Sequence, residues 1–242
     1  MYVLFIKEIR SFFSSAIGFI VIGIFLLLMG TFLWLLPGEN NVLESGYANV
    51  DGLFLLAPWL YLFLIPALTM RFFAEEKKSG TIELLLTRPL STLQIVLAKY
   101  FAGVVLVVLS LLPTLVYVYS VYQLGLPQGN IDMGGFLGSF IGLIFLGAGY
   151  TAIGLWASSV SDNQIVSFLV AALLSFLLYY GFELLSLFFT SAYVQDMVSQ
   201  MGMSYHYDSM SRGVIDSRDV LYFVTISVVF LFATTWFVTK RK

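Results

Sequence analysis

Hydrophobic residues in this chain come in six long, nearly uncharged runs that are separated by polar segments. A helix needs about 20 mostly apolar residues to cross the hydrocarbon core of a bilayer, and each run approaches or exceeds that length. The pattern predicts an all-α membrane protein with six transmembrane helices in one domain over residues 1–242. The expected spans are residues 17–36, 53–72, 100–122, 136–158, 165–189 and 220–238.

Residues 2–13, which precede the first run, have the periodicity of an amphipathic helix. Such a helix can lie in the membrane interface, apolar side on the lipid and basic side toward anionic headgroups. The alternative is a frayed start of the first span. The apolar face would consist of Tyr2, Phe5, Ile6, Ile9, Phe12 and Phe13, with Lys7, Arg10, Ser11 and Ser14 elsewhere.

Proline and glycine mark irregular positions within the runs. Pro58, Pro66 and Pro113 predict kinks, which neighbouring helices can accommodate inside a membrane. The fourth run is rich in glycine, which lets a second helix approach closely, so we expect these glycines to serve packing. They are Gly138, Gly142, Gly147, Gly149 and Gly154.

Composition supports the membrane assignment and excludes several kinds of site. The chain is 60% hydrophobic and 11% charged, whereas soluble domains average about 25% charged residues. Cysteine is absent and His206 is the single histidine, which excludes thiolate chemistry and Cys/His zinc sites. We therefore expect no metal site in this chain. Separately, we expect no catalytic residue and no nucleic-acid partner, although the net charge of −2 by itself says nothing about nucleic acid.

The distribution of basic residues predicts the orientation, because Lys and Arg concentrate on the cytoplasmic side. Ten of the twelve lie before the first span, between spans two and three, or after span six, and Arg212 and Arg218 are the exceptions. Both termini are therefore expected in the cytoplasm, with a cytoplasmic loop at 73–99 and an outer loop at 190–219. The ten are Lys7, Arg10, Arg71, Lys77, Lys78, Arg88, Lys99, Lys240, Arg241 and Lys242.

The loop between spans two and three predicts a very short helix at residues 82–86. Gly80 is placed to end the preceding helix, and Thr81 can cap the next one, with Glu83 near its positive end. Pro89 stops that helix. A Ser-x-x-Gln capping box at 91–94 then starts the helix of span three. The leucines at 84–86 would suit a docking surface, or the segment is an ordinary capped connector.

Residues 76–90 follow the pattern Glu-x-x-x-Gly-Thr-x-Glu-x-Leu-Leu-x-x-Pro-Leu, which resembles the cytoplasmic segment of ABC-2 type permeases. More narrowly, residues 73–91 and 211–222 are similar to the permease associated with gliding motility in Bacteroidetes. The resemblance implies that the short helix is a coupling helix that docks on a separate ATPase. The residues that would shape it are Gly80, Thr81, Glu83, Leu85 and Pro89, with Glu75, Glu76, Lys77 and Lys78 setting its electrostatics.

The resemblance also implies partners and a location. The ATPase would bind ATP and Mg²⁺, since this chain contains no Gly-x-x-x-x-Gly-Lys-Ser/Thr phosphate loop. The permease would pair with a second copy or a related permease in a bacterial inner membrane. Export, in secretion or gliding motility, is the implied direction of transport.

Some residues leave alternatives open. Glu183, the one acid well inside a span, belongs either to the translocation pathway or to the outer interface. Residues 190–219 form either a helical hairpin that dips into the membrane or a plain external loop, in which His206 is expected to be exposed and incidental. The alternative functions are a structural anchor of a motility or secretion complex and an ATP-independent transporter. An intramembrane protease is disfavoured, because His206 lies outside every span and no span contains an aspartate.

Overall fold

The computed structural model describes residues 1–83 and 90–240, apart from the side chain of Ile17. Within this part of the chain the ordered elements are helices and no strand occurs. Six helical segments among the described residues are long and apolar enough to cross a membrane, which confirms the predicted all-α fold. They are Gly18–Leu35, Asp51–Lys78, Thr92–Leu124, Met133–Val160, Gln164–Ser186 and Ser217–Lys240.

Several of these segments are built from more than one helical element. Pro113 lies in a 3₁₀ turn, η2, that joins α6 to α7 within the third segment, so the predicted irregularity is present there. The fifth segment is interrupted by a π-helical turn, η3. In chain order the described elements are α1 (Tyr2–Phe13), α2 (Ala16–Gly30), η1 (Thr31–Leu35), α3 (Asp51–Thr69), α4 (Arg71–Lys78), α6 (Thr92–Leu111), η2 (Leu112–Thr114), α7 (Leu115–Leu124), α8 (Met133–Val160), α9 (Gln164–Phe176), η3 (Leu177–Gly181), α10 (Phe182–Ser186), α11 (Ala192–Ser199), α12 (Met203–Ser211) and α13 (Ser217–Lys240).

Helix α8 is the centre of the bundle and packs against α3, α6, α9, α12 and α13. Its glycines permit these contacts. A Cβ atom on Gly154 would lie 2.0 Å from Oγ1 of Thr69, and one on Gly138 would lie 2.5 Å from Cα of Gly213. Neither position has room for a larger residue, so the predicted packing role of these two glycines is confirmed.

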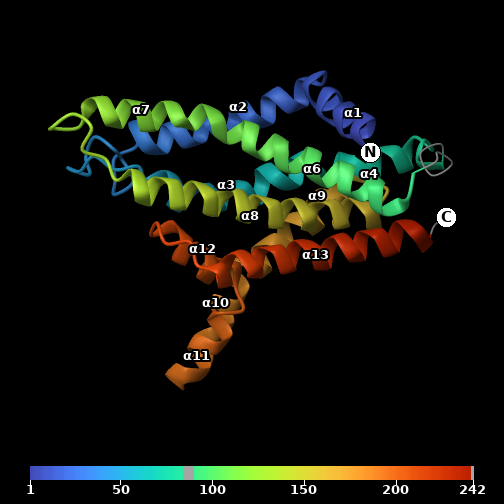
Figure 1. Ribbon diagram of the computed structural model, residues 1–242. Helices are drawn as coiled ribbons and strands as arrows, with labels where there is room; N and C mark the ends of the chain where they lie inside the picture. The colour runs from blue at the N-terminus through green and yellow to red at the C-terminus, as the bar shows by residue number, and fades with distance from the viewer. Residues whose placement is uncertain (84–89, 241–242) are drawn as a thin grey trace.

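The bundle has two ends that differ in what they carry. Both chain termini and α4 lie at one end, and the connection between α7 and α8 lies at the other (Figure 1). We call these the terminal end and the distal end. Two termini at the same end agree with an even number of crossings.

Residues 190–219 contain two short helices instead of an irregular loop. Helix α12 packs on α8 and buries Met203, Tyr207 and Met210. Helix α11 buries no residue, and together with α10 it projects sideways from the bundle (Figure 1). The connection therefore has a packed half and an exposed half.

The amphipathic segment at the N-terminus is a helix of its own. Ser14 and Ser15 separate α1 from α2, so residues 2–13 are not a frayed start of the first span. Helix α1 packs mainly on α6 and also touches α2. The side chains that it buries are Leu4 and Glu8, and Glu8 brings a charge into the interior.

Candidate functional site

The turn after α4 has the geometry that the sequence predicts for a helix end. Ser79 caps α4, and Gly80 follows with a φ of +71°. This left-handed conformation favours glycine, because other residues pay a steric cost for it. The Gly80 N–H donates to the Lys77 carbonyl at 3.1 Å. Gly80 therefore ends the helix, as predicted.

The turn continues into Thr81 and Glu83, whose side chains are exposed. The Thr81 hydroxyl donates to the Glu76 carbonyl at 3.3 Å and lies 2.8 Å from the Ser79 hydroxyl. These contacts hold Thr81 against the last turn of α4. Leu85 and Pro89, the other residues expected to shape the coupling helix, lie outside the described residues, as does most of the expected helix 82–86.

The helix after the loop begins as predicted. The Ser91 hydroxyl accepts from the Gln94 N–H at 3.3 Å, and the Gln94 side chain accepts from the Ser91 N–H at 3.1 Å. This reciprocal pair is a complete capping box at the start of α6.

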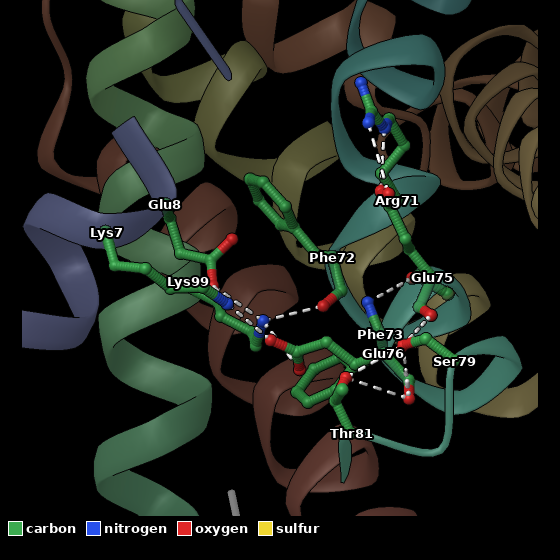
Figure 2. A network of polar contacts seen from close by, with 11 residues as sticks. Lys7, Glu8, Arg71, Phe72, Phe73, Glu75, Glu76, Ser79, Thr81 and Lys99 are labelled. Carbon is green, nitrogen blue, oxygen red and sulfur yellow. Dashed lines mark hydrogen bonds and ion pairs between the residues drawn. The ribbon is translucent and has the colours of Figure 1, made fainter. Parts of the chain in front are cut away.

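A buried ionic cluster lies beside the turn and joins three helices (Figure 2). Its central residue is Lys99 of α6, whose side chain is fully buried. Lys99 Nζ lies 2.9 Å from the Glu8 carboxylate of α1 and 3.0 Å from the Glu76 carboxylate of α4. It also donates to the Phe72 carbonyl at 2.7 Å. One ammonium group thus ties α1 and α4 to α6.

Lys7 closes the cluster on its solvent side. Its Nζ lies 2.8 Å from Glu76 and 3.1 Å from Glu8, while its side chain remains 53% exposed. The four residues Lys7, Glu8, Glu76 and Lys99, which we call the ionic cluster, carry two positive and two negative charges. This balance offsets the large cost of burying unpaired charges.

The charges of the cluster shift the pKa values of its two residues on α1, Lys7 and Glu8. Burial alone would raise the pKa of the Glu8 carboxyl, but Lys99 and Lys7 outweigh it and hold that pKa below its ordinary value. Burial also opposes the charge on Lys7, yet its contacts with Glu76 and Glu8 raise the Lys7 pKa. Both groups are therefore charged at neutral pH.

Further contacts fix α4 to its neighbours. Arg71 bonds Glu75 within α4 at 2.9 Å and donates to the Ser15 hydroxyl at 2.9 Å. The N–H groups of Phe73 and Ala74 donate to the Ser158 hydroxyl of α8 at 2.8 and 3.1 Å. Helix α4 is thereby attached to α8 as well as to α1 and α6.

Lys77 adds a second connection to the neighbouring span. Its ammonium group donates to the Ser159 carbonyl and lies 3.4 Å from the Asp162 carboxylate, in the short connection between α8 and α9. A cavity of about 220 Å³ opens between α1 and α4, and Glu75, Glu76 and Thr81 line part of it. The turn, the cavity and the ionic cluster thus form one continuous region at the terminal end.

Of the residues singled out from the sequence, Glu75, Glu76 and Thr81 line this cavity, Gly80 forms the turn beside it, and Glu83 is exposed just beyond the turn. Sequence reasoning missed Glu8, and it used Lys99 only as one of the basic residues that predict the cytoplasmic side. A weak signal exists for both. Glu8 follows Leu4 by four residues and so shares its helical face, and Lys99 lies among apolar residues near the start of a span.

Glu183 lies apart from this region, in a second cavity of about 370 Å³. Its walls come from the first half of α3, from η3 and α10, and from α12. The carboxylates that line it are those of Asp51, Glu183 and Asp208. We call it the distal cavity.

His206 is not the exposed, incidental residue that the sequence suggested. Its Nδ1 lies 2.7 Å from the Asp219 carboxylate and its Nε2 lies 3.0 Å from the Gln200 carbonyl. The ring stacks on Tyr222 with centroids 4.0 Å apart. It fastens α12 to the start of α13, and sequence reasoning missed this because the partners depend on how the two helices meet.

Comparison with known proteins identifies a family. Residues 36–239 match the family model described as "ABC-2 family transporter protein". Among curated proteins, none matches the chain.

Proposed function

Because the chain belongs to the ABC-2 family of transporter proteins, we propose that it is a permease subunit driven by a separate ATPase subunit that binds ATP and Mg²⁺. The ATPase docks at the terminal end, on the short helix 82–86. Two permease subunits, either two copies or this chain and a related one, form the membrane part of the transporter. The location is the inner membrane of a bacterium.

The observation that carries this proposal is the attachment of the 79–81 turn to the bundle. The turn follows directly on α4, in which Glu76 belongs to the ionic cluster and Lys77 and the backbone of Phe73 contact α8. A displacement of the turn by a closing ATPase would therefore move α1, α6 and α8 with it. Such a rigid connection is what transmission of a domain movement into the membrane requires.

The charge distribution supports a cytoplasmic terminal end. Within the described residues, the basic side chains of α1 and α4 and Lys240 of α13 lie at this end. The distal cavity, in contrast, is lined by three carboxylates. This asymmetry follows the positive-inside rule.

Export in connection with gliding motility or secretion is the narrower part of the proposal. It rests on the similarity of residues 73–91 and 211–222 to the gliding-motility permease. Residues 212–216 of that second stretch connect α12 to α13, and Ser217 and Arg218 begin α13.

The test is purification of the full chain through a C-terminal tag in mild detergent, followed by mass spectrometry of the proteins that accompany it. We expect an ATPase with a phosphate loop to co-purify. Glu83→Ala and Gly80→Pro should weaken this association without preventing membrane insertion, since proline cannot adopt the +71° φ of Gly80. The matched control is Glu39→Ala, which removes an exposed acid between η1 and α3 and should co-purify the ATPase normally.

Two outcomes would contradict the proposal. Normal association and normal transport in both loop variants would remove the short helix as the docking element. Purification of the chain alone, or only with membrane proteins that are not ATPases, would favour the structural anchor or the ATP-independent transporter.

A further inference from the structure

The distal cavity has a chemical character that differs from the rest of the bundle. Three acidic side chains from three separate elements line it, namely Asp51 of α3, Glu183 of α10 and Asp208 of α12. Arg212 places a positive charge near one of them, Asp208. The cavity therefore carries an excess of negative charge.

Aromatic rings form another part of its lining. Trp59 of α3 meets two successive tyrosines of η3, with ring centroids 5.6 Å from Tyr179 and 5.3 Å from Tyr180. The π-helical turn brings these tyrosines to the cavity, and π-helical turns are frequent at functional sites. Trp59 remains 40% exposed, so its ring is accessible to a ligand.

Two buried tyrosine hydroxyls in the same part of the bundle lack hydrogen-bond partners among the described residues. The Tyr150 ring packs edge-on against Tyr179 with centroids 6.3 Å apart. The hydroxyls of Tyr150 and Tyr61 are fully buried, and neither finds a hydrogen-bond partner among the described residues. Buried polar groups normally have a partner, so the Tyr150 hydroxyl leaves bonding capacity behind the Tyr179 ring.

From this arrangement we propose that the distal cavity binds an organic ammonium cation between Trp59, Tyr179 and Glu183. The face of an aromatic ring attracts a cation, most strongly for tryptophan, and the carboxylates add a longer-range attraction. The claim that such a cation is the transported molecule rests on the proposed transport function. The claim that the cavity binds it rests on the cavity alone.

The same features exclude two other ligands. Across the described residues, no three acidic or histidine side chains are placed to hold a metal ion together, so the carboxylates do not form a metal site. A lipid headgroup with a phosphate would bring negative charge against three carboxylates. A cation without a phosphate therefore fits the cavity better than a zwitterionic headgroup.

Burial of the Asp208 carboxyl, together with the neighbouring charge of Glu183, raises the Asp208 pKa, and Arg212 opposes this effect. The two carboxylates thus repel each other when the cavity is empty. A bound cation would relieve that repulsion.

The test uses the purified full chain in detergent, without an ATPase, and isothermal titration calorimetry with three small probes. Choline is the cation, 3,3-dimethylbutan-1-ol is its uncharged analogue of the same shape, and phosphocholine adds a phosphate. We expect choline to bind at least about tenfold more tightly than either of the others. Glu183→Gln and Trp59→Leu should each weaken choline binding about tenfold. Asp196→Asn, which removes an acid of α11 outside the cavity, should leave it unchanged.

Equal affinity for choline and 3,3-dimethylbutan-1-ol would overturn the inference, as would the absence of choline binding. Phosphocholine binding as tight as that of choline would assign the cavity to lipid headgroups instead. Should Trp59→Leu fail to fold, Glu183→Gln decides the matter alone. Co-purification of the ATPase depends on the terminal end, so either proposal can fail while the other stands.

Discussion

Lys99 Nζ and the Glu8 carboxylate lie 2.9 Å apart, although 91 residues separate them in the chain. The contact is buried and is supported by Glu76 and by the Phe72 carbonyl. It joins the amphipathic helix α1 to the helix that follows the proposed docking loop. The amphipathic helix α1 is thereby held in one unit with α4 and α6, the helices on either side of the proposed docking loop.

Replacement of Lys99 by methionine should strongly destabilise the protein. The change leaves Glu8 and Glu76 side by side without their shared cation, and breaking a buried ion pair costs about 3–5 kcal/mol. For a chain of this size we expect the melting temperature in detergent to fall by about 6–20 °C. Lys7→Met is the control, because that side chain is 53% exposed and its pairs should contribute at most about 1 kcal/mol. Similar losses in both variants would contradict the central role of Lys99.

Glu8→Gln should loosen the docking of α1. The natural chain contains no cysteine, so single cysteines report on exposure without background. Leu4→Cys occupies a buried position and should react slowly with a water-soluble maleimide. In the Glu8→Gln background we expect its reaction to be about tenfold faster, since a hydrogen bond to a charged group is lost. Arg10→Cys, at an exposed position, should react equally fast in both backgrounds. Unchanged protection of Leu4→Cys would show that apolar contacts alone hold the helix.

The Glu8 carboxyl should also make the thermal stability of the protein depend on pH in the acidic range. Its pKa in the folded protein is below the ordinary value of 4.5, so its stabilising contribution is complete above pH 4.5 and is lost as the pH falls through the folded pKa. The difference in melting temperature between the natural chain and Glu8→Gln should therefore be constant from pH 7 to about pH 5 and shrink below about pH 4. A difference that grows on acidification would have the wrong sign.

The elements that sequence reasoning predicted correctly depend on local signals. Run length predicts a span whatever its neighbours are, and the capping box of Ser91 and Gln94 involves residues three apart. Gly80 likewise ends α4 through its own backbone conformation. These features need no knowledge of how the helices pack.

The features that sequence reasoning missed depend on helix packing. The apolar residues around Lys99 are only a weak local signal that its side chain is buried, and they do not identify its partners. The pairing of Lys99 with Glu8 follows from the docking of α1 on α6, and that of His206 with Asp219 follows from the contact of α12 with α13. Glu183 was recognised as unusual, but its cavity could not be foreseen because four separate elements, α3, η3, α10 and α12, build it.

Gly154→Ala should destabilise the bundle at the contact of α8 with α3. The added Cβ would lie 2.0 Å from Oγ1 of Thr69, and Thr69 is itself fixed by a hydrogen bond of 2.9 Å to the Ile65 carbonyl. The helices must therefore separate locally, and overpacking of this kind costs about 1–3 kcal/mol.

Gly23→Ala in α2 is the matched control, because its Cβ would meet no atom within 4 Å and alanine is the better helix former. We expect thermal unfolding in detergent to show a lower melting temperature for Gly154→Ala and an equal or higher one for Gly23→Ala. The double change Gly154→Ala with Thr69→Ala should recover part of the loss, since it removes the hydroxyl oxygen and the methyl group that lie 2.0 and 3.3 Å from the added Cβ. Equal melting temperatures for Gly154→Ala and the natural chain would mean that α3 and α8 are not in close contact at this point.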